Sequence, residues 1–500
     1  MDFGALLAAA SRWCRTRLDP LLGAPATHKV VGHGGGDASK NPCLLYTAVF
    51  VGGSLATFML ALAIMSPVTP SYRDSGRPRY AGASQGARQR GLVFSRQGMG
   101  GGNGGWSSAV PLVCVYDRNS ERAKEPVRYQ MLKHLPARYC SHLVYGFVSP
   151  VDLNNSTSKS TAGSVANARR RLKQMVQLKK HSPALKVLVA VGGPKVDSKA
   201  FSDELITEGR REHFAQRAVR WLRSLRLDGL LVQWMFPGQG NGRPSDRQNL
   251  PRLMAQLRKA FKAENSAWQL LIYMPHDDGV LDRGYEVRAV SNTVDHIIMG
   301  TYGYVEPGLT EITSPLFNRA PSPGRSPTNS IHELVTLLVD RGAPRHKLLI
   351  GVSAAGVSYS LARGDTSVRA PLRSKHAEGN AGPFTQTPGR LAYFEVCYNV
   401  YRNNWARVFD AATSCPYAYS GLEWVTYDDP DSLRAKVAFL RNQSLGGAAL
   451  MDVAADDYMA MCGPRNVLSR TLHASLKHYA PRALPSVQRQ RGVRKRRWGR

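Results

Sequence analysis

The stretch Asp228-Gly229-Leu230-Leu231-Val232-Gln233-Trp234-Met235-Phe236-Pro237-Gly238 decides the fold. A run of bulky apolar residues closed by Pro-Gly predicts a buried β-strand that ends in a turn. Side chains two apart on a strand share a face, so Leu231, Gln233 and Met235 should point the same way. None of these three side chains can donate or accept a proton in a reaction.

Similar apolar runs recur along residues 109–478, and segments with helical periodicity separate them. The runs are SHLVYGFV (141–148), LKVLVAVGG (185–193), LDGLLVQWMF (227–236), WQLLIYM (268–274), VDHIIMGTY (294–302), HKLLIGVSA (346–354) and GGAALMDV (446–453). Continuous apolar strands that alternate with amphipathic helices predict a parallel sheet, and about eight such units predict a TIM (β/α)₈ barrel.

The region around residue 228 resembles glycoside hydrolase family 18, the chitinases and chitinase-like proteins, whose strand pattern is Asp-Gly-x-Asp-x-Asp-x-Glu. Asp228 and Gly229 match this pattern, Leu231 and Gln233 stand at the next two Asp positions, and Met235 stands at the position of the catalytic Glu. Further matches follow in the family's order: VGG at 191–193, PG at 237–238, PLFNR at 315–319, FEVC at 394–397 and WVTYDDPDSLRAKVAFL at 424–440. The resemblance also implies a small α+β insertion at about 357–430, between the seventh and eighth strands, where the helical rhythm breaks.

The family's chemistry requires the acid that this strand lacks. In family 18 the Glu protonates the glycosidic oxygen, the substrate's N-acetyl group attacks the anomeric carbon, and the preceding Asp stabilises that group. Met235 cannot protonate a leaving group, and Gln233 could hydrogen-bond an acetamide but brings no charge. Loss of general acid catalysis alone typically lowers a rate ~10²–10⁴-fold. The resemblance therefore implies a pseudoenzyme with no catalytic residue and no cofactor.

The residues that should line the sugar-binding groove, according to the resemblance, are also altered. Pro194 and Met451 stand at two of the family's Trp positions, Gly300 and Gly303 replace the Met and Asp of its Met-x-Tyr-Asp signature, and Ala355 and Val357 replace a Tyr and an Arg. The residues left as candidate ligand contacts are Phe147, Gln233, Phe236, Tyr302, Trp424 and Met451. All four aromatic residues have core packing as an alternative role, which we favour for Phe147 and Phe236. We therefore do not expect chitin-type binding in this groove, although another ligand could fit a widened pocket.

Five of the seven cysteines lie in the barrel region. The resemblance implies disulfides between Cys114 and Cys140 and between Cys397 and Cys462, which would leave Cys415 over; buried thiols are the alternative. Disulfides require an oxidising compartment, so this region should be lumenal or extracellular. Acceptor triplets for N-glycosylation occur at Asn154, Asn155 and Asn442, a pattern that often arises by chance.

Residues 44–65, LLYTAVFVGGSLATFMLALAIM, carry no charge. Twenty-two residues in a helix span ~33 Å, about the hydrocarbon thickness of a bilayer, which predicts a transmembrane helix and a single-pass membrane protein. A signal peptide would lie closer to the first Met, and a buried core helix would show a polar face. Residues 1–43 then form a cytosolic tail, residues 66–108 a flexible Gly/Ser/Arg-rich stalk and residues 479–500 a basic tail.

The net charge of +31 predicts attraction to polyanions such as acidic polysaccharides or phospholipid surfaces. Nucleic acid is the least favoured partner, because no nucleic-acid-binding motif accompanies the charge.

Two other functions stay open. A hydrolase could use new carboxylates near the strand ends, such as Asp277, Asp278, Asp452 or Asp456, and a purely structural or signalling ectodomain could act through its basic surface. His276-Asp277-Asp278 could be imagined as a metal-ligand set, but such loop residues are usually solvated, so we expect no metal.

Overall fold

The computed structural model describes residues 110–118, 128–154, 159–304, 308–318, 330–362, 371 and 375–481. The expected cytosolic tail, membrane helix and stalk lie outside these ranges, as does the basic tail beyond residue 481. Within the ranges, none of the helices combines the length and the hydropathy that crossing a bilayer requires.

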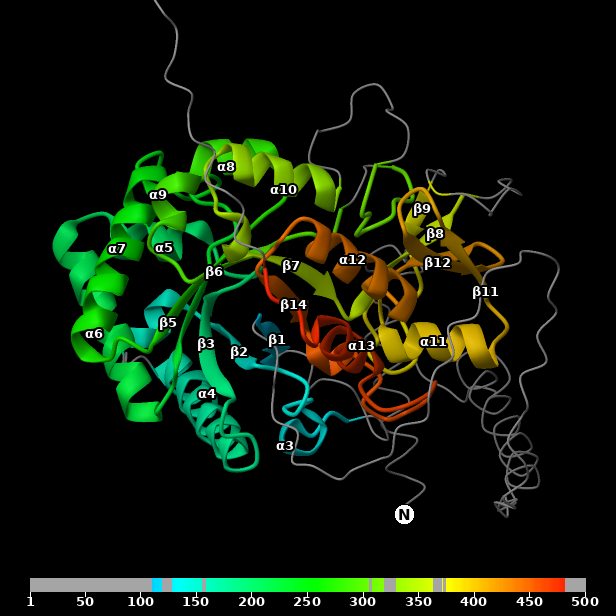
Figure 1. The fold of residues 1–500 in the computed structure, drawn as a ribbon, viewed down its shortest axis with the longest axis horizontal. Helices are drawn as coiled ribbons and strands as arrows, with labels where there is room; N and C mark the ends of the chain where they lie inside the picture. Colours follow the sequence, from blue (N-terminus) through cyan, green and yellow to red (C-terminus); the bar gives the residue numbers. More distant parts are fainter. Residues whose placement is uncertain are drawn as a thin grey trace, which may run out of the picture. The chain divides into compact units, whose positions relative to one another are not determined.

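Eight parallel strands close into a barrel (Figure 1). They are β1 (Leu112–Asp117), β2 (His142–Val148), β3 (Lys186–Gly192), β4 (Gly229–Gln233), β5 (Gln269–Met274), β6 (His296–Met299), β7 (Leu348–Ser353) and β14 (Gly447–Met451). Each strand pairs with its neighbour in chain order, and β14 pairs with both β7 and β1. The predicted TIM barrel is confirmed.

Helices connect these strands on the outside of the barrel (Figure 1). The α-helices are α3 (Met131–His134), α4 (Lys159–Gln177), α5 (Ser198–Leu205), α6 (Glu208–Leu225), α7 (Asp246–Glu264), α8 (Asp278–Gly284), α9 (Val287–Ser291), α10 (Ile331–Asp340), α12 (Pro430–Asn442) and α13 (Val467–Leu476). Short 3₁₀ turns occupy η4 (Pro150–Asn154), η5 (Leu178–Lys180), η6 (Arg345–Lys347) and η7 (Val453–Ala455). Side-chain oxygens of Thr207 and Asp429 accept backbone N–H groups at the starts of α6 and α12, which satisfies donors that a helix leaves open.

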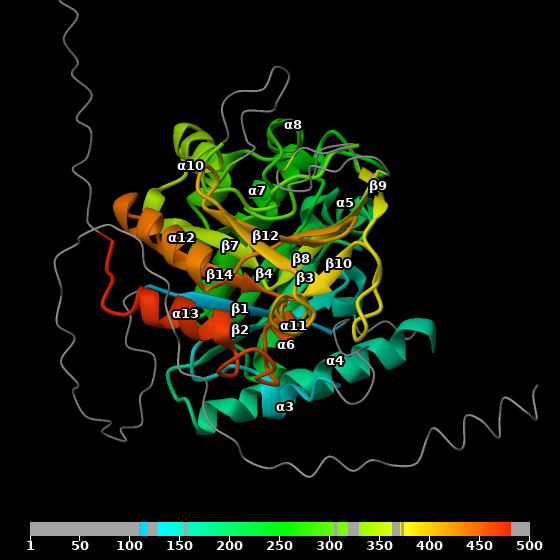
Figure 2. The same ribbon diagram turned by 90° about the vertical axis from the view of Figure 1, so that its right-hand side faces the viewer.

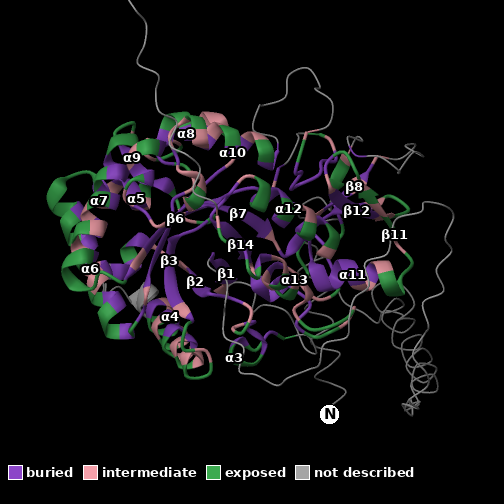
Figure 3. Ribbon diagram, viewed as in Figure 1, coloured by how far each residue is buried: buried purple, intermediate pink, exposed green. Residues whose placement is uncertain are grey.

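The period-two pattern of β4 places its side chains in two different cores. Leu230, Val232 and Trp234 belong to the large cluster between the strands and the helices, whereas Leu231 lies in the smaller cluster inside the barrel. Met235 packs against that inner cluster, as the sharing of a strand face predicts. Figure 3 shows the barrel strands buried and the helices exposed on their outer surfaces.

A second, antiparallel sheet is inserted between β7 and β14 and is best seen in Figure 2. It contains β8 (Ala355–Leu361), β9 (Lys375–Glu378), β10 (Arg390–Ala392), β11 (Ala406–Asp410), β12 (Cys415–Ser420) and β13 (Glu423–Thr426), together with α11 (Tyr393–Arg402). Strand order is β10-β8-β13-β12-β11, with β9 beside β8. This α+β unit stands where the sequence predicts the insertion.

Two disulfides join the cysteine pairs that the resemblance implied. Cys114 on β1 is bonded to Cys140, just before β2, and Cys397 on α11 is bonded to Cys462 in the loop before α13. Cys415 is a buried free thiol, and burial raises its pKa to about 12. The thiol therefore stays protonated at neutral pH.

Candidate ligand site at the barrel mouth

β4 ends at the C-terminal face of the barrel, which we call the barrel mouth, and Gln233 is its last residue. The Gln233 side chain is 3% exposed, and its Nε2 donates to Sδ of Met235 at 3.5 Å. Among the described residues, its Oε1 has no hydrogen-bond partner. An unsatisfied buried acceptor destabilises a fold by ~1–3 kcal/mol, so a donor that reached this oxygen would be stabilising.

The glycines of the VGG motif bring β3 against β4 at this point. Gly192 and Gly193 have φ of +104° and +97°, a region that L side chains rarely adopt. A Cβ on Gly192 would lie 2.1 Å from the backbone oxygen of Gln233, and one on Gly193 would lie 2.5 Å from the ring of Phe147. The motif thus allows close contact between the strand ends and seats Phe147 on the inner cluster.

Two tyrosines lie beside β4, one on β5 and one just after β6. The ring centroids of Tyr273 and Tyr302 are 6.4 Å apart in an edge arrangement, and their hydroxyls are hydrogen-bonded. Burial raises the pKa of Tyr273 to about 12 and raises the pKa of Tyr302 well above its ordinary value. Both phenols therefore stay neutral at physiological pH and can serve a ligand only as hydrogen-bonding groups.

An ion pair at the rim joins the inserted sheet to the barrel. Arg390 of β10 lies 2.6 Å from the carboxylate of Asp452, which follows the last residue of β14. Both charges act on the phenol of Tyr302, which places the pair close to the mouth. The inserted sheet therefore supplies a cation to one wall of the candidate site.

The structure brings together Phe147, Met235, Tyr302 and Met451, all packed on the inner cluster. Phe236 is 47% exposed and lies outside that cluster, so the core alternative for this residue is wrong. Trp424 requires a correction, because it is fully buried in the inserted sheet. Its ring stacks on Tyr417 at 5.2 Å, so it offers no face to a ligand.

Asp228, which matches the family's motif, lies at the opposite end of β4. Its carboxylate accepts the N–H of Val187 at 2.7 Å and pairs with Lys179 at 2.5 Å. Both contacts tie the start of β4 to β3 and to η5. This carboxylate stabilises the barrel base rather than a ligand.

The alternative carboxylates near the strand ends are already engaged by partners. Asp277 caps α8 through the N–H of Val280, Asp278 pairs with Arg341, and Asp452 pairs with Arg390. The buried Asp456 accepts N–H groups at the start of α13, including that of Ser469 at 2.9 Å. Each carboxylate thus has a structural role, which weakens the hypothesis of a hydrolase that uses them.

His276 does not combine with its two neighbours into a metal site. Its Nδ1 lies 3.1 Å from the carbonyl of Gly300, its ring lies against Tyr304, and burial lowers its pKa. Among the described residues, potential metal-ligand atoms gather at Cys397, Asp457 and Cys462. There both sulfurs belong to a disulfide, so the group cannot act as a thiolate site.

Of the three candidate glycosylation sites, only Asn442 has a side chain that the structure describes. Asn442 is exposed as the last residue of α12. Asn154 ends η4 without a described side chain, and Asn155 lies outside the described residues.

Two residues of the mouth were missed in the sequence. Tyr273 lies two positions after Leu271 on β5, so the period-two rule that placed Leu231 could have found it. Arg390 carries no local signal, because its position depends on how the inserted sheet packs.

Known proteins share this architecture. The family model of Glycosyl hydrolases family 18 matches residues 112–456. The chain is 33% identical to chitotriosidase-1 of Mus musculus, over 74% of this chain and 79% of the relative. It is 30% identical to chitinase-3-like protein 2 of Homo sapiens, over 70% and 88% of the two chains.

Solved structures of known proteins have a similar fold. A Group IV chitinase of Ostrinia furnacalis matches with a TM-score of 0.68 and 27% identity, over 73% of this chain and 99% of the other. Human YKL-39, described as a pseudo-chitinase with retained chitooligosaccharide binding properties, matches with a TM-score of 0.64 and 26% identity, over 74% and 100%. With its closed barrel, inserted sheet and matched motifs, this chain belongs to glycosyl hydrolase family 18.

Proposed function

We propose that this chain is a catalytically inactive, chitinase-like protein that binds a neutral oligosaccharide at the barrel mouth. The observation that carries the proposal is the end of β4, where the inward-facing positions hold the amide of Gln233 and the thioether of Met235. Neither group can protonate a glycosidic oxygen, and a carboxyl brought in from elsewhere would first have to leave its structural partner.

The groups of the mouth suit hydrogen bonding to an uncharged ligand. Gln233 offers a buried amide oxygen that has no partner in the described part of the chain, and Tyr302 offers a phenol that stays neutral. Phe147 and Met451 supply apolar surface beside them. A ligand N–H or O–H that reaches the Gln233 oxygen would gain ~0.5–1.5 kcal/mol and would satisfy the open acceptor.

The comparison with human YKL-39 supports a chitooligosaccharide as the ligand class, since that pseudo-chitinase is described as retaining chitooligosaccharide binding. In this chain the mouth lacks the Trp platforms that the family resemblance implies at Pro194 and Met451. Aromatic stacking contributes much of the contact area in such sites. We therefore infer that binding persists but is weaker than in a family member with both rings.

The same proposal places the barrel outside the cytosol, held by the uncharged segment 44–65. Support comes from the length of that segment and from the two disulfides, which form in oxidising compartments. Protease protection in sealed microsomes tests the orientation: the barrel should be digested only after the membrane is opened. Release of the chain by alkaline carbonate would contradict the anchor.

The binding claim is tested by calorimetry of the full-length chain with chitotetraose. We expect a measurable affinity that falls when Gln233→Leu removes the buried amide. Gln248→Leu, at an exposed position on α7, is the matched control and should leave the affinity unchanged. Equal affinities for both variants and the native chain would place the ligand elsewhere or refute the site.

A further inference from the structure

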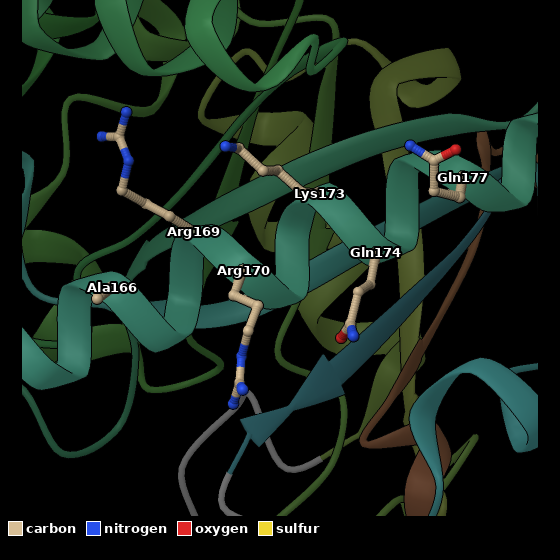
Figure 4. Close-up of a pocket in the computed structure, with 6 residues that line it drawn as sticks. All are labelled: Ala166, Arg169, Arg170, Lys173, Gln174 and Gln177. Carbon is tan, nitrogen blue, oxygen red and sulfur yellow. The ribbon is translucent and has the colours of Figure 1, made fainter.

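The middle of α4 carries a basic hollow that is separate from the barrel mouth (Figure 4). This shallow hollow of about 420 Å³ is lined by Ala166, Arg169, Arg170, Lys173, Gln174 and Gln177. Arg169, Lys173 and Gln177 project to one side of the helix axis, and Arg170 and Gln174 project to the other. Residues four apart are ~6 Å apart along a helix, so the first row spans ~12 Å.

The charge of this surface has no acidic counterpart in the local sequence. Between Asp152 and Asp197 there are nine Lys or Arg residues and no Asp or Glu. Arg170 and Lys173 are both exposed, and the guanidinium of Arg170 donates to the neutral side chain of Asn167 at 2.9 Å. The hollow therefore takes its side chains from a stretch of α4 that supplies several cations and no carboxylate.

Contacts with α6 hold part of the hollow in place. The guanidinium of Arg169 lies over the ring of Trp221 at 5.0 Å and donates to Oγ of Ser224 at 3.1 Å. Trp221 is 2% exposed, so it provides a fixed support for the guanidinium. Arg220, one turn before Ser224 on α6, is also exposed. A cation that is already oriented loses less freedom when it binds an anion.

We propose that this hollow, defined by Arg169, Arg170, Lys173, Gln174 and Gln177, binds a sulfated glycan chain. Guanidinium groups match the oxygens of a sulfate in a fork geometry, and Lys173 adds a point charge. The amides of Gln174 and Gln177 can donate to and accept from sugar hydroxyls. A sulfated glycan combines both kinds of group, anionic oxygens and neutral hydroxyls, along one chain.

Two other polyanions fit the lining less well. Single-stranded nucleic acid is usually bound by basic residues interleaved with aromatic platforms, and the lining contains no aromatic residue. A helix that docks on an anionic bilayer presents large apolar side chains beside its basic ones, whereas Ala166 is the one apolar residue of the lining. The hollow lies on the outer helices, so the proposal is independent of the ligand at the barrel mouth.

The test measures the affinity of the full-length chain for a heparin hexasaccharide at two salt concentrations. Because the whole chain is strongly basic, the informative comparison is between variants that lose the same charge. R170Q/K173Q removes two cations from the hollow, and R252Q/K259Q removes two exposed cations from α7. R170K/K173R keeps both charges and shows whether replacement of the side chains by itself disturbs the helix.

We expect R170Q/K173Q to bind the hexasaccharide roughly tenfold more weakly, which is what two exposed charge contacts can supply together. R252Q/K259Q and R170K/K173R should stay within about twofold of the native chain. Equal losses in R170Q/K173Q and R252Q/K259Q would show general charge attraction and overturn the site. A uridine dodecamer and phosphatidylserine vesicles are measured in the same way. If the native chain binds either of them more tightly than the hexasaccharide, and R170Q/K173Q weakens that binding, the choice of a glycan is overturned.

Discussion

A Cβ atom on Gly300 would lie 2.2 Å from the hydroxyl oxygen of Tyr273, a distance that no real Cβ contact tolerates. The absence of a side chain at position 300 is therefore what lets Tyr273 extend through the barrel interior and reach Tyr302. In the family's signature this position holds Met. The altered mouth is thus a repacked site in which a tyrosine occupies space that a side chain at position 300 would otherwise fill.

This relationship predicts a strong coupling between the two residues. Gly300→Ala should lower the free energy of unfolding by ~1–3 kcal/mol, because overpacking forces the tyrosine to move. Tyr273→Phe removes the atom in closest contact, so the double variant should lose less stability than the sum of the single losses. Chemical denaturation of all four chains gives the coupling energy, and strict additivity would contradict the contact.

Gln233 should separate stability from binding. Gln233→Leu removes a buried oxygen to which no described residue donates, so the free energy of unfolding should stay unchanged or rise by ~1 kcal/mol. The same variant should lose affinity for chitotetraose. Thermal denaturation beside the calorimetry distinguishes the two effects; a destabilised variant with native affinity would show that the amide serves the fold instead.

Stability should depend on pH through two histidines at the base of the barrel. Burial lowers the pKa of His142 to about 3 and that of His296 to about 4. In the unfolded chain the pKa of a histidine is ~6.5. Between the folded and the unfolded pKa, the unfolded chain therefore binds more protons than the folded chain. Stability is fully present above pH ~6.5 and declines as the pH falls through that window, by up to ~1.4 kcal/mol per pH unit for each histidine.

His142→Asn checks this sign. It should reduce the slope of the unfolding free energy against pH by ~1.4 kcal/mol per pH unit, which corresponds to one proton. His213→Asn removes an exposed histidine from α6 and should leave the slope unchanged. A native slope that is flat between pH 4 and 6.5 would contradict the assignment.

The buried ion pair between Lys436 and Asp428 predicts an asymmetric response to substitution. Both side chains are at most 2% exposed, and Nζ of Lys436 also donates to Oγ of Ser314 at 2.7 Å. Asp428→Asn should destabilise the chain by ~3–5 kcal/mol, because an uncompensated ammonium stays buried. Asp428→Asn combined with Lys436→Met should recover part of that loss. Denaturant titration measures it, and equal losses in the single and double variants would contradict the pairing.

The sequence predicts the framework of this protein better than its ligand site. Alternation along β4 correctly separates Leu231 and Met235 from Leu230 and Val232, because the period of two is set by local backbone geometry. Trp424 was expected to face a ligand, yet the register of β13 turns it into the core of the inserted sheet. The pair formed by Arg390 and Asp452 joins segments 62 residues apart, and only tertiary packing brings them together.

The central claim is that the mouth over β4 binds without cleaving, and product analysis by mass spectrometry tests it most directly. The full-length chain is incubated for a long period with chitohexaose, beside a chain with Met235→Ala. The account predicts intact hexaose in both reactions. Shorter oligomers that form with the native chain and vanish with Met235→Ala would contradict it.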